Sequence, residues 1–109
     1  MKKRLEESVY RLVVAEVGDY DRKKKRLAEG HLTTDQVAEY TRKTSAIENA
    51  LLSVCRGESL EAQNALRADI ALGRGFNSSA AKNIYISRST YSRRKREAVW
   101  SIAVMLRLI

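Results

Sequence analysis

Apolar residues in the first part of the chain recur at helical intervals. Between about residues 4 and 29 they fall on one face of a helix with 3.6 residues per turn. Gly30 predicts the end of this helix, while Gly18 weakens its middle and allows a kink or a break. The residues of the apolar face are Leu5, Val9, Leu12, Val13, Tyr20 and Leu27.

The stretch "TTDQ" predicts the start of a second helix, because Thr33 and Gln36 have the spacing of a capping box. This helix is expected to end near Gly57. Its apolar side consists of Val37, Tyr40, Thr44, Ile47, Leu51 and Val54. A short "GHLT" loop joins the two helices. Residues 1–57 are therefore predicted to form a long antiparallel hairpin that serves as a scaffold or an oligomerisation unit.

Residues 58–109 are predicted to form a supporting helix followed by a helix-turn-helix. Ser59 can cap the supporting helix, which runs to about Leu72 and ends at "GRG". The chain contains no Pro and only five Gly, so the usual helix breakers are rare. We therefore expect an all-α protein whose two parts make one continuous folded domain.

The spacing of a few residues identifies the helix-turn-helix more specifically than composition does. Ser78 or Ser79 can cap its first helix, and Ser87 can cap its second. The small and apolar residues expected to pack the two helices together are Ala80, Ala81, Ile84, Ile86 and Tyr91. Among them, Ala81 falls where the helices cross and Tyr91 where the second helix is anchored to the first. Tyr85 departs from the motif, because many helix-turn-helix proteins have Gly there.

The last helix divides into two faces when its residues are placed about 100° apart. Its predicted core stripe consists of Tyr91, Ala98, Ile102, Leu106 and Ile109. Another side carries Ser89, Ser92, Arg93 and Arg96, with Arg88 at its edge. This side is basic and rich in hydroxyl groups, and it lies at the helix N-terminus, which enters the major groove in helix-turn-helix proteins.

Positive charge is concentrated in the last third of the chain. The whole chain carries 21 Lys and Arg against 13 Asp and Glu. Residues 1–73 hold 13 basic against 12 acidic residues, a balance of +1, whereas residues 74–109 hold eight basic residues against Glu97 alone, a balance of +7. Such a local field attracts a polyanion. The run "RKKKR" at 22–26 has acidic neighbours, which favours a solvated helix surface over an accessory phosphate contact.

Few residues of the sequence point to catalysis or to metal binding. Cys55 and His31 are the only residues of their types, so neither an internal disulfide nor a soft-ligand metal site can form from them. We expect Cys55 in the core, His31 in a loop, no enzyme activity and no cofactor. The longest apolar stretch, "AVWSIAVML", is about half the ~20 residues of a membrane span, and the start "MKKRLEES" does not resemble a signal peptide. These features predict a cytoplasmic, soluble protein.

Double-stranded DNA is the partner that this pattern predicts. Arg can bridge two acceptors of guanine, and Ser can contact either bases or phosphates. The candidate base-reading residues are Arg88, Ser89, Ser92 and Arg93. The candidate contacts to the DNA backbone are Arg74, Lys82, Ser87, Thr90, Arg94, Lys95 and Arg96.

The C-terminal stretch "IYISRSTYSRRKREAVWSIAVMLRLI" resembles the C-terminal signature of ArpU/RinA-type regulators of phage late genes. The resemblance covers residues 80–109 and implies a phage or prophage transcriptional activator with a helix-turn-helix similar to the promoter-reading region of sigma factors. The residues that match the motif are Ser87, Arg88, Ser89, Thr90, Tyr91 and Arg93. Ser92 and the ending "MLRLI" depart from it.

Trp100 and Val104 point away from the predicted core stripe of the last helix. They can pack against the hairpin or against a second subunit, so a homodimer through these residues and the hairpin stays open, as does a contact of the hairpin with host RNA polymerase. Two other functions also stay open. The chain can be a DNA-packaging or recombination accessory protein, or a non-catalytic helical interaction module whose basic helix binds an acidic partner.

Overall fold

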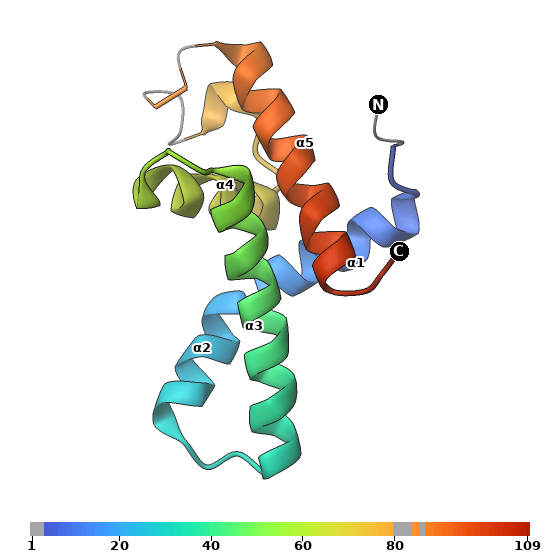
Figure 1. The fold of residues 1–109 in the computed structure, drawn as a ribbon, viewed down its shortest axis with the longest axis vertical. Helices are drawn as coiled ribbons and strands as arrows, with labels where there is room; N and C mark the ends of the chain where they lie inside the picture. The colour runs from blue at the N-terminus through green and yellow to red at the C-terminus, as the bar shows by residue number, and fades with distance from the viewer. Residues whose placement is uncertain (1–3, 80–83, 86) are drawn as a thin grey trace.

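A computed structural model describes residues 4–79, 84–85 and 87–109. Its elements are α1 (Glu7–Gly18), α2 (Tyr20–Glu29), α3 (Thr34–Val54), α4 (Leu60–Leu72), the 3-10 helix η1 (Phe76–Ser78) and α5 (Arg88–Met105). No strand occurs among these described residues. The prediction of an all-α fold is therefore confirmed (Figure 1).

The helix expected over residues 4–29 is broken into two. Asp19 separates α1 from α2 with φ −92° and ψ −1°, and its carboxylate pairs with Arg22 in the first turn of α2 at 2.5 Å. Only α2 runs antiparallel to α3, whereas α1 turns away and packs against α4 and α5 (Figure 1). The break places the buried side chains of Val13 and Val17 in the core. The first arm of the hairpin is therefore α2 alone.

The residues that the sequence predicts as helix caps have that role in the structure. Thr33 and Gln36 form a reciprocal capping box at the start of α3. Ser59 accepts a hydrogen bond from the backbone of α4, and Ser87 does the same for α5. Gly73 ends α4 in the left-handed region, at φ 66°, which favours Gly because other residues crowd their own carbonyl there. Local signals thus specify the starts of α3, α4 and α5 and the end of α4.

The core is built where α3 packs on α5 and α1 packs on α4. The largest fully buried side chains are Tyr91, Ile47, Leu66, Ile70, Ile102, Val13, Asp69 and Cys55. Cys55 is a packing residue, as expected, and burial raises the pKa of its thiol, so the reactive thiolate is disfavoured. His31 lies in the α2–α3 loop. In the part of the chain that the structure describes, no helix combines the length and the hydropathy needed to cross a bilayer.

Several ion pairs tie α2 to its neighbours, in addition to the packing of Tyr20 against the core. Lys23 is its one buried residue, and its Nζ lies 2.6 Å from Oε2 of Glu16 in α1. Lys43 of α3 reaches the other oxygen of Glu16 at 3.1 Å. Lys24 pairs with Glu48 of α3 at 3.2 Å. Arg22 pairs with Asp19, three residues before it. Three of the five cations of "RKKKR" therefore have partners within the chain, as we expect of a helix surface with a structural role.

Candidate nucleic-acid interface

The two ends of α5 have different surroundings. Its C-terminal half is held in the core by Ala98, Val99, Ile102, Ala103 and the following Leu106. Its first turns project from the opposite end of the molecule to α2, beside η1 (Figure 1). In these first turns Tyr91 is buried, while the residues on the other side are exposed. The fold therefore presents the N-terminal end of α5 to solvent on a rigid base.

The predicted core stripe is correct as far as Leu106, which directly follows α5, and wrong at Ile109. Tyr91, Ala98, Ile102 and Leu106 are buried. Ile109, however, is 54% exposed. The helix ends at Met105, and Arg107 adopts φ 59°, so the chain no longer follows helical geometry at its last residues. A helical wheel cannot place Ile109 because the backbone has already turned.

Five exposed residues form a continuous basic and hydroxyl-bearing surface on α5, which we call the reading face. They are Arg88, Ser89, Ser92, Arg93 and Arg96. The first turn of α5 carries no acidic residue, whereas each of α1 to α4 carries one. An acidic side chain normally complements the positive end of the helix dipole. Its absence here, together with three arginines, makes this end of the helix attractive to anions.

The three cations of the reading face differ in how the rest of the chain holds them. Arg88 donates to Oδ1 of Asn77 at 3.0 Å and lies over the ring of Phe76. The nearest contact between Arg93 and Glu97 is 3.8 Å, and the Arg93 side chain is 59% exposed, so this pair contributes little. Arg96 makes no hydrogen bond or ion pair with any described residue. All three guanidinium groups can reach an external ligand.

Hydroxyl groups order the start of α5. Oγ of Ser87 accepts the backbone N–H of Thr90 at 3.4 Å and lies 2.8 Å from Oγ of Ser89. A capping serine of this kind typically stabilises a helix by about 1 kcal/mol. Ser87 therefore acts first as a structural cap, and Ser89 lies against it at the edge of the reading face.

Three of the other candidate DNA-backbone contacts, Arg74, Arg94 and Lys95, have partners inside the chain. Arg94 pairs with Glu58 at 3.1 Å and with Glu97 at 3.6 Å. The ammonium group of Lys95 donates to the carbonyl oxygen of Arg74 at 2.6 Å, and burial lowers the pKa of Lys95. These cations hold α5 to the preceding segments. Glu58, which sequence reasoning missed, is one of the anchors.

The predicted first helix of the helix-turn-helix falls mostly on residues that the structure leaves undescribed. Ala80, Ala81, Lys82 and Ile86 all lie outside the described residues. Ser78 belongs to η1, and Ile84 is in a turn. The structure therefore has a helix, α5, where the second helix of the motif is predicted, and it does not test the first.

A buried carboxylate that the sequence analysis did not single out organises the segment before α5. Asp69 of α4 is fully buried. Its Oδ2 accepts hydrogen bonds from the hydroxyl groups of Ser79 and of Tyr91, the latter at 2.5 Å. Its Oδ1 forms an ion pair with Nε of Arg74 at 3.1 Å, although neither of these two atoms completes a hydrogen bond. One side chain thus collects partners from the loop after α4, the end of η1 and α5.

Tyr91 is a polar anchor as well as an apolar one. Burial, followed by the hydrogen bond to Asp69, raises the pKa of Tyr91 to about 12, so its hydroxyl remains a donor at neutral pH. A signal for this pair was present in the sequence. Asp69 occurs three residues after Leu66 and directly before Ile70, on the apolar side of its helix, where a carboxylate needs partners.

Aromatic rings complete the support of the reading face. The ring of Tyr91 lies 5.4 Å from that of Phe76 and 5.9 Å from that of Tyr85. Tyr85 is 4% exposed, and its hydroxyl lies 4.0 Å from Sγ of Cys55. Burial raises the pKa of Tyr85 as well. Tyr85, which stands where many helix-turn-helix proteins have Gly, thus supplies a buried ring that links the segment before α5 to the end of α3.

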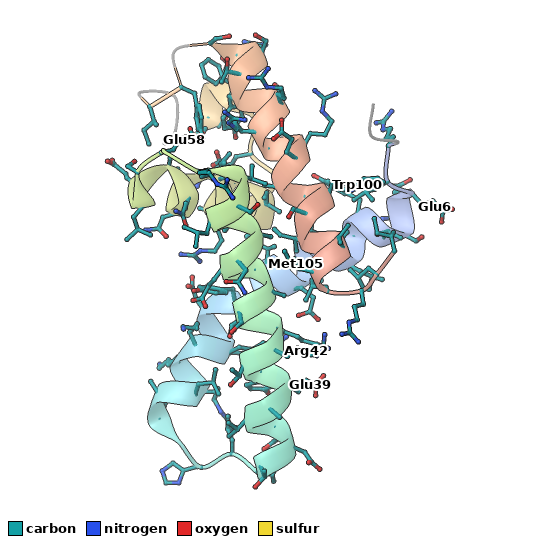
Figure 2. All side chains as sticks on the ribbon, in the orientation of Figure 1. Glu6, Glu39, Arg42, Glu58, Trp100 and Met105 are labelled. Carbon is teal, nitrogen blue, oxygen red and sulfur yellow. The ribbon has the colours of Figure 1, made fainter. Side chains whose placement is uncertain are left out.

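The far end of α5 carries apolar surface outside the core stripe. Figure 2 shows Trp100 midway along the helix and Met105 at its end. Trp100 is partly exposed, Val104 is 47% exposed and Met105 is 43% exposed. Trp100 and Val104 therefore lie away from the core stripe, as the helical wheel predicts.

Among the described residues, no group of three or more His, Cys, Asp or Glu is placed to hold a metal ion. Comparison of the chain with protein-family models, curated proteins and solved structures finds no match.

Proposed function

We propose that this chain binds double-stranded DNA in a sequence-specific manner and regulates transcription. The observation that carries the proposal is the reading face, where exposed arginines and serines share the N-terminal end of a helix whose other end is fixed in the core. Rigid placement matters because base readout depends on accurate geometry. The net charge of +7 over residues 74–109, to which Arg88, Arg93 and Arg96 contribute, would attract a polyanion.

The chemistry of the reading face suits the major groove of DNA. The groove is ~12 Å wide and admits one α-helix. Arg88 and Arg93 can each donate two hydrogen bonds to the O6 and N7 atoms of guanine, and Ser89 and Ser92 can contact bases beside them. Arg96 lies farther along the helix and suits a phosphate. Lys82 and Thr90 remain proposed contacts to the DNA backbone.

The resemblance to ArpU/RinA-type regulators favours transcription over other uses of DNA binding. In this proposal α5 is the second helix of a helix-turn-helix that docks on a promoter or operator of phage late genes. The α2–α3 hairpin lies at the opposite end of the molecule (Figure 1). It is free to contact a partner such as host RNA polymerase while α5 is on DNA.

Selection of duplexes from a random pool tests the proposal. The native chain should enrich one sequence pattern. The double variant Arg88→Ala with Arg93→Ala should lose the preference for that pattern, by about 5-fold to 150-fold for each arginine that contacts guanine, which corresponds to ~1–3 kcal/mol. A matched control removes two exposed cations of α2, Lys25→Ala with Arg26→Ala, and should keep the preference.

The alternatives predict different outcomes. If the double variant weakens binding equally on all sequences, the two arginines contact phosphates only. If the native chain enriches no duplex and binds a random duplex no better at low salt, the DNA proposal is wrong and the interaction module becomes the better interpretation. A reporter carrying the selected sequence then separates regulation from packaging or recombination, since only a regulator changes its expression.

We also propose that a homodimer forms through Trp100, Val104 and the hairpin, since a dimer would present two reading faces to two half-sites. The exposed apolar side chains of Val104 and Met105 support this. Sedimentation at tens of micromolar should show a dimer that Val104→Glu dissociates. A monomeric native chain with concentration-independent Trp100 fluorescence would remove the dimer.

A further inference from the structure

The 3-10 helix η1 lies against the start of α5 and contacts one residue of the reading face. Oδ1 of Asn77 accepts a hydrogen bond from Nη2 of Arg88 at 3.0 Å. The guanidinium carbon of Arg88 lies 5.9 Å from the centre of the Phe76 ring, within the range of a cation–π contact. Two neighbouring residues thus hold the same guanidinium through two different interactions.

This arrangement leaves Arg88 able to bind a ligand. A guanidinium group has five N–H donors in a fixed plane, and Asn77 uses one of them. The remaining donors suffice for the paired hydrogen bonds that guanine accepts. Because a free arginine side chain samples many rotamers, fixing its plane beforehand reduces the entropy lost on binding.

The residues that hold Arg88 are themselves fixed to the core. The ring of Phe76 packs on that of Tyr91 at 5.4 Å. Tyr91 is 1% exposed and donates to the fully buried Asp69. A continuous series of contacts therefore runs from the interior of α4 to the tip of the reading face. Arg93 and Arg96 have no such support from another element among the described residues.

We propose that Asn77 and Phe76 are positioning residues that set DNA sequence specificity by holding the Arg88 guanidinium ready for a guanine. This inference rests on the proposed function and identifies which part of the chain outside α5 shapes its readout. Arg88 is then the specific contact of the reading face. Arg93 is the more mobile one.

Two substitutions test the positioning role in DNA binding. The probes are the duplex most enriched by the native chain and a shuffled duplex of the same composition. Asn77→Ala should lower the preference for the enriched duplex about threefold to tenfold, as expected when one side chain must be ordered on binding. Affinity for the shuffled duplex and its salt dependence should not change, because Asn77 is uncharged. Phe76→Leu keeps an apolar contact with Tyr91 but removes the ring, and should lower the preference in the same way.

The matched control is Asn64→Ala on α4, which removes an exposed Asn away from η1 and should leave the preference unchanged. Circular dichroism and thermal melting verify that each variant keeps its helices. NMR relaxation of the Arg88 side-chain Nε–Hε group in the free protein tests positioning without DNA. This group should be ordered in the native chain and should become mobile in Asn77→Ala.

The outcomes separate this inference from the proposed function. If the native chain selects a duplex but Asn77→Ala retains full preference, the positioning role is wrong while DNA recognition stands. If Asn77→Ala binds the enriched duplex more tightly, Asn77 competes with the base and the role is also wrong. If no duplex is enriched by the native chain, DNA recognition fails, and the specificity role fails with it even when Arg88 is ordered in the free protein.

Discussion

At the scale of residues, the segment that supports the reading face is organised by a buried charge. Asp69 is fully buried and is surrounded by a tyrosine hydroxyl, a serine hydroxyl and an arginine. Taking a carboxylate out of water is costly unless charged or hydrogen-bonded partners compensate. Each partner of Asp69 therefore matters more than an ordinary surface hydrogen bond, because its removal leaves the carboxylate short of a donor.

Tyr91→Phe should lower the free energy of unfolding by about 1–3 kcal/mol, because it removes a donor to a buried carboxylate while the ring still fills its site. Urea denaturation measures the change. Tyr10→Phe is the control, since Tyr10 is on the exposed side of α1 and should change stability by less than about 0.5 kcal/mol. Equal stability of Tyr91→Phe and the native chain would show that Asp69 does not depend on this hydroxyl.

At the scale of elements, helix ends are decided locally, whereas the break between α1 and α2 is decided by packing. A Cβ added at Gly18 meets nothing within 4 Å, so Gly18 is not required by any close contact. The directions of α1 and α2 differ because α1 buries apolar side chains against α4 and α5, while α2 is tied to α3 and α1 by ion pairs. Tertiary contacts therefore place the break, and the backbone at Gly18 does not require a glycine.

Two Gly→Ala substitutions should therefore have opposite effects. Gly18→Ala should raise the free energy of unfolding by about 0.5–1 kcal/mol, because Ala favours the helix and reduces the freedom of the unfolded chain. Gly73→Ala should lower it by about 1–2 kcal/mol, because φ is 66° at this cap. Urea denaturation of both variants measures the two changes. Destabilisation by Gly18→Ala would mean that the break itself needs a glycine.

At the scale of the whole molecule, the two halves of the chain share one core. The core cluster takes buried side chains from α1, α3, α4 and α5. The most extensive contacts cross between the halves, since α3 packs on α5 and α1 packs on α4. Within residues 58–109, α4 and α5 contact each other much less. The helix that carries the reading face thus depends on the N-terminal half for its position.

A fragment of residues 58–109 should therefore show little helix by circular dichroism and no cooperative thermal transition. Mixing it with residues 1–57 should restore helix content, because the apolar faces of α3 and α5 then cover each other. The intact chain is the reference for both measurements. Cooperative unfolding of the isolated fragment would show instead that residues 58–109 form an autonomous domain.

The candidate site could be predicted only in part from the sequence. Helical periodicity correctly placed Ser89, Ser92, Arg93 and Arg96 on one exposed side of the last helix, because a regular helix fixes the angle between its residues. The same reasoning could not show that Lys95 donates to the backbone at Arg74, since that contact joins segments that are distant along the chain. It also could not show that Asn77 holds Arg88.

The sequence by itself determined the helical class, the caps at Thr33, Ser59 and Ser87, and the two-sided character of α5. These features depend on interactions between residues a few positions apart, which a linear pattern records. Only the tertiary structure decided the direction of α1, the partners of buried Asp69 and the cations left available on the reading face. Those outcomes depend on which distant surfaces bury one another, because burial and partner choice are properties of the packed chain as a whole.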